Sequence, residues 1–561
     1  MSTTKTNCRI IADVLAAHGV KNIVCSPGSR NAPMLLAADS LPGVRTHVVI
    51  DERSAAFVAL GIAQISRQPV ALICTSGTAM LNYAPAVAEA YYQGLPLIVV
   101  SADRPERWID QDDSQTIRQP GALGNFVKKS YDIPDFAADD KDMAIYADRE
   151  ANDAMITAMR RRRGPVHINV RLNEPLTRGE RLPHGNPRII RCLEADDILP
   201  KETVREMAEK AADKKILVVA GFMLPDARLN KALLRFMALP NVYVMHETIS
   251  NLHLPKRHSA VDVILSTLSE EVKESLRPDI IITLGGALVS RAVKELLRSY
   301  QGIEHWAVGH SHNTVDCFNS LSLRIDAEPA RFFSMLGKYI NKQRPESDYN
   351  HCWSVARKEA VSSHNRFVAS CGWSDLKACQ IIFDALPEDC NVQLSNGTAV
   401  RYAQLCINRM PHGCYCNRGV SGIDGCVSTA VGAAMAYPDT TVLLTGDMSM
   451  AYDIGALSLF DIPERLKIIV LNNQGGGIFR FIPSTRTLPE REQYFCAQPR
   501  LPLDKIAPAY GIEYYRASSQ QQLQNILPIF LSPSLSPSLL EIVTHGDVSA
   551  SILIDYMNRN N

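Results

Sequence analysis

Short apolar runs alternate with longer helical patterns along the whole chain. Runs typical of buried strands lie at residues 22–25, 47–50, 70–74, 97–100, 166–170, 216–219, 242–244, 279–283, 392–394, 441–445, 467–471 and 539–543. Alanine-rich and amphipathic stretches separate these runs, which is the order expected of parallel sheets covered by helices. The pattern predicts an α/β fold of three doubly wound parallel-sheet domains at residues 1–185, 195–345 and 350–561, with polar, proline-bearing linkers at 181–187 and 343–348.

The composition of this 561-residue chain favours small molecules as partners. Lysine plus arginine and aspartate plus glutamate both number 59, so no net field attracts nucleic acid or an anionic membrane. No apolar run is long enough to span a bilayer, the first residues lack a secretory signal, and the 14 cysteines are scattered, which together predict a cytoplasmic protein. Cys414 and Cys416 near His412 form a weak candidate for a metal site, because no second cysteine pair accompanies them.

Polar residues follow two strand-like runs in the third block, and a helix is expected between them at residues 452–460. Gly446, Asp447, Met448 and Ser449 come after the run at 441–445, while Asn473 and Gly475 come after the run at 467–471. Open α/β sheets bind ligands at the carboxyl ends of their strands, and Mg²⁺ takes carboxylate, amide and carbonyl oxygens there. The alternative is a strand-end acid followed by ordinary turn residues.

The spacing of these residues resembles the signature of thiamine-diphosphate enzymes, which begins Gly-Asp and ends Asn-Asn. The resemblance implies that Asp447, Asn473 and the Gly475 carbonyl hold Mg²⁺ or Mn²⁺, which clamps the cofactor's diphosphate. Met448 stands where the family usually has glycine, a departure that some branches share. The implied cofactor contacts are Glu52, Gly446, Met448, Ser449, Ser421 and Ile423. Ile423 would be the apolar wedge that bends the cofactor, although its position alone also suits a core isoleucine.

Glu52 follows a strand-like run in the first block and opens a helical segment at 54–63. Acids at helix N-termini are common because they cap the helix and oppose its dipole, so capping is one interpretation. The resemblance implies another, in which Glu52 is the catalytic carboxyl that hydrogen-bonds to N1′ of the cofactor's pyrimidine. In that family the glutamate comes from one subunit and the metal site from its partner, which implies a homodimer or homotetramer.

Further motifs resemble one branch, the 2-succinyl-5-enolpyruvyl-6-hydroxy-3-cyclohexene-1-carboxylate synthases of menaquinone biosynthesis. These motifs lie at residues 26–33, 75–78, 102–105, 115–121, 417–425 and 475–479. The branch decarboxylates 2-oxoglutarate and adds the succinyl unit to isochorismate. The implied substrate residues are Ser29, Arg30, Arg104, Gln115, Arg291, Arg401, Arg418, Ile478 and Phe479. Arginine suits substrates with several carboxylates because its planar fork binds them bidentately, whereas an ordinary ion pair is the alternative for each arginine.

Two departures from the branch concern substrate contacts and not the reaction class. Gly397 stands where a serine often precedes the third-domain arginine, with Thr398 beside it, and Ala292 leaves Arg291 as the one cation of a basic pair. The nearest alternative function is another thiamine-diphosphate enzyme, a 2-oxo acid decarboxylase or an acetohydroxyacid-synthase-like carboligase. A nucleotide-binding oxidoreductase is disfavoured because no G-x-G-x-x-G follows a strand, and a silent binding protein is disfavoured by the glutamate and metal ligands.

Overall fold

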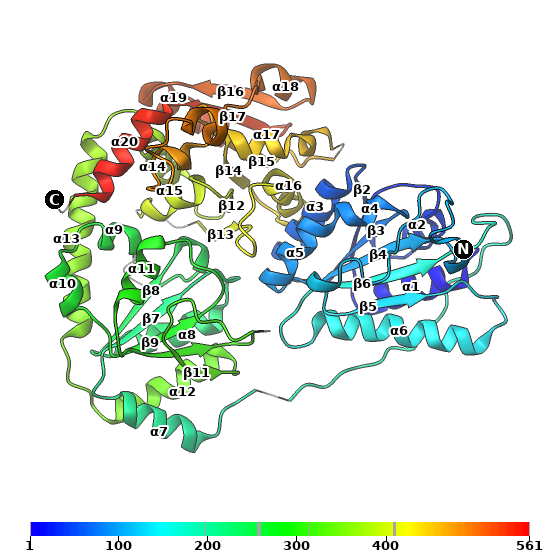
Figure 1. The fold of residues 1–561 in the computed structure, drawn as a ribbon, viewed down its shortest axis with the longest axis horizontal. Helices are drawn as coiled ribbons and strands as arrows, with labels where there is room; N and C mark the ends of the chain where they lie inside the picture. The colour runs from blue at the N-terminus through cyan, green and yellow to red at the C-terminus, as the bar shows by residue number, and fades with distance from the viewer. Residues whose placement is uncertain are drawn as a thin grey trace. The chain divides into compact units, whose positions relative to one another are not determined.

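The computed structural model describes residues 2–195, 197–254, 260–311, 313–407, 411–459 and 461–559. Three sheets with helices between their strands make up this part of the chain, and every strand pair whose register is described is parallel (Figure 1). The predicted α/β class with three parallel sheets is therefore confirmed.

The first sheet has the strand order β2-β1-β3-β4-β6-β5. Its strands are β1 (Asn22–Cys25), β2 (Arg45–Val48), β3 (Val70–Cys74), β4 (Leu97–Asp103), β5 (Ser130–Ile133) and β6 (Val166–Arg171). The helices around it are α1 (Thr6–Ala17), α2 (Ala32–Asp39), α3 (Glu52–Ser66), α4 (Thr78–Asn82), α5 (Ala84–Gln93) and α6 (Lys141–Met159). The order reverses between β1 and β3, and such a switch point opens a crevice at the carboxyl ends of the strands.

The interior strands of the first sheet are buried on both faces, which explains why they are apolar runs without a polar face. Ile23, Ile73 and Val100 pack with α1, α2 and α6 in one core. Side chains at the alternate positions, such as Leu72, are also fully buried, and α3 packs against β1 and β3. Helices α1 and α6 lie together on one side of this sheet in Figure 1.

The second sheet has the order β11-β10-β9-β7-β8. Its strands are β7 (Ile216–Ala220), β8 (Val242–His246), β9 (Ile280–Leu284), β10 (Glu304–Val308) and β11 (Leu321–Ile325). The helices of this region are α7 (Lys201–Ala211), α8 (Ala227–Phe236), α9 (Val261–Leu265), α10 (Glu270–Ser275), α11 (Arg291–Ser299) and α12 (Pro329–Lys342). The 22-residue helix α13 (Tyr349–Ser370) follows, and its Trp353 is buried against Tyr243 of β8.

The third sheet has the order β13-β12-β14-β15-β17-β16, which is the order of the first sheet with the strands renumbered. Its strands are β12 (Asn391–Leu394), β13 (Gly413–Cys416), β14 (Thr441–Gly446), β15 (Leu466–Asn472), β16 (Glu513–Ala517) and β17 (Ser538–Val543). The helices of this region are α14 (Asp375–Ala385), α15 (Ala399–Leu405), α16 (Cys426–Ala436), α17 (Asp447–Tyr452), α18 (Leu503–Ala509), α19 (Gln520–Phe530) and α20 (Gly546–Met557). Its switch point lies between β12 and β14.

The chain divides into two compact units, which are described separately below. The first unit comprises Met1–Glu194, Asn417–Pro438 and Tyr452–Leu466, and the second comprises Ala195–Cys416, Asp439–Ala451 and Lys467–Asn561. The domain boundaries suggested by the sequence pattern stay a prediction.

Two local predictions are wrong. The second strand of the first sheet is Arg45–Val48, two residues earlier than expected, because the apolar Val48 and Ile50 lie exposed at a sheet edge and mark no buried strand. A helix over 452–460 is not found in its described part. Instead α17 begins directly at Asp447, and a 3₁₀ helix covers Ile454–Ser458, while Phe460 lies outside the described residues.

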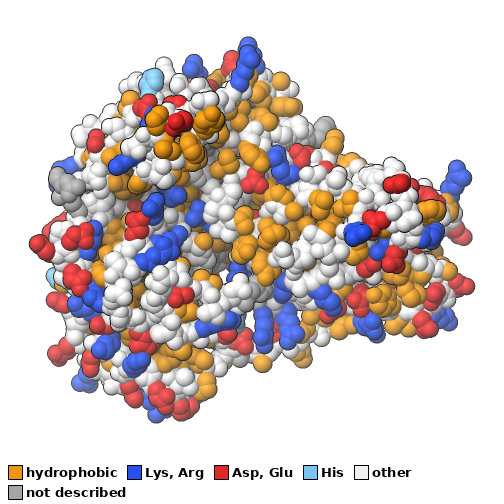
Figure 2. Space-filling view, in the orientation of Figure 1, with side chains coloured by type: hydrophobic (Ala, Val, Ile, Leu, Met, Phe, Trp, Pro, Cys, Tyr) orange, Lys and Arg blue, Asp and Glu red, His pale blue; other side chains and the backbone are white. Residues whose placement is uncertain are grey.

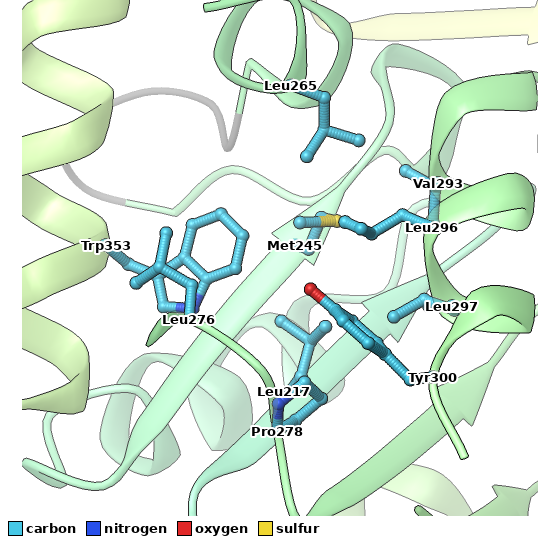
Figure 3. A pocket seen from close by; sticks show the side chains of 10 residues that line it. All are labelled: Leu217, Met245, Leu265, Leu276, Pro278, Val293, Leu296, Leu297, Tyr300 and Trp353. Atoms are coloured by element: carbon cyan, nitrogen blue, oxygen red, sulfur yellow. The ribbon is translucent and has the colours of Figure 1, made fainter. Parts of the chain in front are cut away.

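A small apolar cavity of about 10 Å³ lies between the second sheet and the helices packed on it. Leu217, Met245 and Leu276 line it together with Tyr300 and Trp353 (Figure 3). A cavity of this size holds at most a single water molecule, and its apolar lining gives that water few partners, so it is a packing defect rather than a ligand site.

The surface agrees with the balanced charge of the sequence, since acidic and basic side chains are interspersed over the face shown in Figure 2. Within the described ranges, none of the helices combines the length and apolar character that crossing a membrane requires.

Candidate active site

A buried acid stands at the carboxyl end of β14, next to the switch point of the third sheet. Asp447 is 3 % exposed, and its two oxygens accept backbone hydrogen bonds, Oδ1 from Met448 N at 2.8 Å and Oδ2 from Gly475 N at 2.7 Å. Burial raises the pKa of Asp447 to about 6, with a further upward contribution from the nearby Asp375 and a downward one from the two N–H groups. The structure therefore brings Asp447 and Gly475 together, as the sequence predicts.

The loop after β15 takes an unusual backbone path that presents Gly475 to Asp447. Gln474 and Gly475 have φ angles of 66° and 119°, and a Cβ on Gly475 would lie 2.4 Å from the carbonyl oxygen of Cys496. Only glycine fits there without strain. The buried Arg480 fixes the same turn, because its guanidinium donates to the carbonyl oxygens of Asn473 at 3.0 Å and of Gln474 at 2.9 Å.

Asn473 has the arrangement expected of a metal ligand. Its Nδ2 donates to Oδ2 of Asp375 at 2.7 Å, whereas its Oδ1 is buried and has no hydrogen-bond partner. An unpaired buried carbonyl oxygen is costly, and a buried carboxylate such as that of Asp447 is costly as well. A divalent cation would satisfy both, so this site fits a hard cation of the Mg²⁺ type.

Other predicted residues of the second unit lie in or next to the segments that follow β14 and β15. Gly446 ends β14, and its N–H donates to Ser395 Oγ at 3.3 Å across the switch point. Met448 is half-buried and Ser449 is buried in α17. Ile478 and Phe479 are half-buried in a 3₁₀ helix, Gly477–Arg480, which follows the Gly475 turn.

Glu52 is the first residue of α3 in the first unit, but it does not cap that helix. Asp51 is the N-cap, and its carboxylate accepts hydrogen bonds from Arg53 N at 2.9 Å and Ser54 N at 3.3 Å. Burial raises the pKa of Cys74 and of Tyr83, and the charge of Glu52 raises both further, which places its carboxylate near these two side chains. Asp51 therefore caps α3, and capping does not explain the presence of Glu52.

Helix α3 packs closely against α16 within the first unit. A Cβ on Gly61 would lie 2.1 Å from the carbonyl oxygen of Thr429, and a Cβ on Gly432 would lie 2.0 Å from that of Val58. Glycine at both positions lets the two backbones approach, and this contact fixes the start of α16 and the loop before it.

That loop carries Arg418, Ser421 and Ile423. The buried Glu89 of α5 accepts hydrogen bonds from Gly419 N at 2.6 Å and Val420 N at 2.7 Å, which holds the loop in place. Burial raises the pKa of Glu89, while these N–H groups and the charge of Arg418 oppose the rise. Ser421 is exposed with a φ of 65°, and Ile423 is half-buried, so Ile423 is not an ordinary core residue.

Two of the predicted arginines lie close to each other in the first unit. Burial lowers the pKa of Arg30, and the neighbouring charge of Arg104 lowers it further. Arg30 pairs with Glu174 at 3.1 Å, and Arg104 pairs with Asp113 at 3.1 Å and donates to Ser114 O at 2.8 Å. Ser29 is exposed beside Arg30.

Gln115 lies on the loop that holds Arg104. It has a φ of 60°, and its amide nitrogen donates to Ser76 O at 3.2 Å. The buried Gln119 supports this region, because its Oε1 accepts from Gly77 N at 2.7 Å and its Nε2 donates to Ala102 O at 3.1 Å. Arg30, Arg104 and Gln115 thus gather beyond the carboxyl ends of β1, β3 and β4.

The arginines of the second unit differ from each other. Arg401 in α15 is half-buried, donates to Val289 O at 3.4 Å and lies near Asp262. Burial raises the pKa of Asp262, and the hydroxyl of Ser290 and the charge of Arg401 oppose that rise. Arg291, next to Ala292 at the start of α11, has a side chain that is 68 % exposed and pairs with Glu295.

Gly397 precedes α15 with a φ of 88°, a conformation that suits glycine better than the serine of the branch. Cys414 and Cys416 are buried in β13, and Cys416 donates to Asn396 Oδ1 at 3.3 Å. Across the residues that the structure describes, no group of three or more histidine, cysteine or acidic side chains could hold a metal ion.

Comparison with known proteins gives the family of the chain. Residues 6–122 match the model of the thiamine pyrophosphate enzyme N-terminal TPP binding domain, and residues 396–542 match that of the C-terminal TPP binding domain. A 2-succinyl-5-enolpyruvyl-6-hydroxy-3-cyclohexene-1-carboxylate synthase of Porphyromonas gingivalis is 39% identical over 98% of this chain and 96% of its own length. The chain belongs to this synthase family.

Two further relatives with the same name extend the match. The protein of Flavobacterium johnsoniae is 36% identical over 97% of each chain, and that of Bacteroides thetaiotaomicron is 33% identical over 100% of this chain and 99% of its own. These relatives confirm the predicted branch and favour it over a simple 2-oxo acid decarboxylase or an acetohydroxyacid-synthase-like carboligase. The chain is thus a thiamine-diphosphate-dependent enzyme.

Three residues that hold these loops are absent from the sequence prediction. Asp375 and Arg480 contact Asn473, and Glu89 contacts the loop that carries Arg418. Asp375 and Glu89 lie far along the chain from their partners, whereas Arg480 is only seven residues from Asn473 and no motif of the sequence marks it. A serine followed by an aspartate at a helix start, as at Ser374 and Asp375, signals only a cap.

Proposed function

We propose that the chain decarboxylates 2-oxoglutarate and adds the resulting succinyl unit to isochorismate, giving 2-succinyl-5-enolpyruvyl-6-hydroxy-3-cyclohexene-1-carboxylate and CO₂. The observation that carries the proposal is that the buried carboxylate of Asp447 accepts from Gly475 N, two residues after Asn473, whose buried amide oxygen has no partner. Asp447, Gly475 and Asn473 form the proposed metal cage. This cage suits the cation of a diphosphate cofactor, and the family membership supplies the substrates.

In this proposal Asp447, the Oδ1 of Asn473 and the carbonyl of Gly475 hold Mg²⁺ or Mn²⁺, while Gly446, Met448 and Ser449 lie beside the diphosphate. Ser421 and Ile423 contact the cofactor from the loop that Glu89 holds, with Ile423 as the wedge. When bound, thiamine diphosphate supplies the carbanion stabilisation that decarboxylation of a 2-oxo acid needs. Glu52 holds a proton at the pyrimidine N1′, the role of a positioned acid or base.

Arg30, Arg104, Arg291, Arg401 and Arg418, together with Ser29 and Gln115, bind the carboxylates and hydroxyls of the substrates. The gathering of Arg30 and Arg104 supports this assignment, because two neighbouring cations disfavour each other unless anions compensate them. Their present partners, Glu174 and Asp113, are partly exposed acids that substrate carboxylates would have to displace. Ile478 and Phe479 form the apolar wall of the substrate pocket.

A direct assay tests the function. Purified protein should form the product from 2-oxoglutarate and isochorismate, and product formation should require thiamine diphosphate and Mg²⁺. Pyruvate in place of 2-oxoglutarate is the control for the alternative carboligase. Turnover of pyruvate with no turnover of 2-oxoglutarate would reject the proposal.

We expect Arg401→Ala to weaken the use of 2-oxoglutarate or isochorismate and to leave cofactor binding intact. A hydrogen bond to a charged group is worth about 1.5–3 kcal/mol, which corresponds to roughly a ten- to hundredfold change in affinity. Steady-state kinetics for each substrate and a cofactor titration measure the two effects. Arg366→Ala, on the exposed side of α13, is the matched control. Wild-type KM values for both substrates would remove Arg401 from the site.

We also propose that the enzyme assembles as a homodimer or homotetramer in the cytoplasm, with Glu52 of one subunit and Asp447 of its partner in the same active site. Val48 and Ile50, just before Glu52, are 63% and 81% exposed, an apolar surface that suits a subunit interface. The 14 cysteines are free thiols, which suits a reducing compartment.

Complementation tests the shared site. Chains with Glu52→Gln and chains with Asp447→Ala, each inactive alone, should restore activity when they are co-expressed. Random pairing makes about half of the dimers mixed, and each mixed dimer has one intact site of two, so roughly a quarter of the wild-type activity should return by symmetry. Activity no higher than that of the single variants, in samples shown to contain mixed dimers, would place both residues in one chain's site.

A further inference from the structure

The amide nitrogen of Asn473 is hydrogen-bonded, whereas its amide oxygen has no hydrogen-bond partner. Its Nδ2 lies 2.7 Å from Oδ2 of Asp375, and its Oδ1 is buried without a hydrogen-bond partner. We infer that Asp375 is a positioning residue, whose carboxylate orients the Asn473 amide so that its oxygen and not its nitrogen is presented to the metal ion. This inference rests on the metal site proposed above.

The two ends of an amide are nearly equal in size, so packing alone does not choose between them. Their chemistry is opposite, because the oxygen accepts and the nitrogen donates. Both oxygens of Asp375 accept hydrogen bonds, Oδ1 from the Thr544 hydroxyl and Oδ2 from Nδ2 of Asn473, so Asp375 selects the orientation in which Nδ2 faces it. The reversed amide would bring two oxygens together at Asp375 and would turn a hydrogen-bond donor toward the cation.

Asp375 is itself held by hydrogen bonds to α20 and to the residue after β17. It is the first residue of α14, and its N–H donates to Ser549 Oγ of α20 at 3.1 Å. Its Oδ1 accepts from the hydroxyl of Thr544, which follows β17, at 2.6 Å. Thr544 N in turn donates to Asn472 O at 3.1 Å, so the carboxylate is tied to the strand that carries the predicted ligand.

A neighbouring pair provides a matched comparison. Glu541 of β17 is buried and accepts a hydrogen bond from Nδ2 of Asn472 at 2.6 Å. Glu541 therefore accepts a hydrogen bond from the amide nitrogen of Asn472, as Asp375 does from that of Asn473. Asn472, however, is not a proposed metal ligand. A change from acid to amide at each position separates orientation of the ligand from a general effect of altering a buried carboxylate.

The experiment is a Mn²⁺ titration in the presence of thiamine diphosphate, followed by the electron paramagnetic resonance signal of free Mn²⁺. Asp375→Asn should weaken Mn²⁺ binding about 10- to 100-fold, the usual effect of losing a group that orients a metal ligand. An asparagine at 375 can both donate and accept, so it no longer selects one orientation of Asn473. Glu541→Gln should stay within about twofold of the wild type, a change too small to reflect loss of an orienting group.

Thermal unfolding of the metal-free proteins shows whether each variant folds. If Asp375→Asn does not fold, Thr544→Val takes its place, because it removes a donor from the Asp375 carboxylate and should weaken Mn²⁺ binding severalfold. A folded variant with wild-type Mn²⁺ affinity, or equal weakening in Glu541→Gln, would overturn the role of Asp375. Failure of the wild type to bind Mn²⁺ with the cofactor would instead reject the proposed metal site, and the inference with it.

Discussion

Replacing Asp447 by alanine should abolish binding of thiamine diphosphate together with Mg²⁺. The Asp447 side chain is the one acid among the proposed ligands, and Asp447 is 3 % exposed. Without it the site no longer holds the cation, and the charge of the diphosphate is left uncompensated in a partly dry site. The remaining ligands, an amide oxygen and a backbone carbonyl, are neutral. We therefore expect no measurable cofactor affinity at concentrations that saturate the wild type.

Calorimetric titration of thiamine diphosphate with Mg²⁺ measures this effect. Asp439→Ala is the control, because it removes an exposed acid that precedes the same strand, β14. Thermal unfolding without metal tests whether the Asp447 variant folds. Wild-type affinity in a folded Asp447→Ala protein would reject the metal assignment.

The interior strands could be predicted from the sequence because both of their faces are buried. β3, β4, β14 and β15 each carry a run of buried apolar residues for this reason. The strands that the pattern does not reveal are mostly at sheet edges, namely β5, β11, β13 and β16. β11 and β16 are largely exposed and carry polar side chains, so they look like loops in the sequence.

The placement of the candidate site residues was predictable where they form a short motif. Asp447 and Gly475 are 28 positions apart, and the structure joins them by one hydrogen bond. The supporting residues were not predictable, since Asp375 reaches Asn473 from 98 positions away and Glu89 reaches Gly419 from 330. Such contacts depend on how helices pack on the sheets, and a pattern of apolar positions does not specify which polar side chain fills the space between them.

Replacing Glu52 by glutamine should lower the rate by about 10²- to 10⁴-fold, the usual contribution of a positioned proton-transfer group. Glutamine keeps the size of the side chain but cannot exchange a proton with the pyrimidine N1′. The fold should be unaffected, because Asp51 and not Glu52 accepts the hydrogen bonds that cap α3. Much of the cofactor affinity should remain, since the proposed metal ligands lie elsewhere.

Exchange of the C2 proton on bound thiamine diphosphate is the direct measurement, with a cofactor titration beside it. Asp51→Ala is the matched comparison, and it should show the opposite result. Loss of an N-cap costs about 0.5–2 kcal/mol of stability, so that variant should unfold at a lower temperature and retain proton exchange. If Glu52→Gln exchanged the C2 proton at the wild-type rate, Glu52 would have no part in proton transfer. The hydrogen bonds of the cap leave Glu52 no structural role in α3, so a loss of stability in Glu52→Gln equal to that of Asp51→Ala would contradict this assignment.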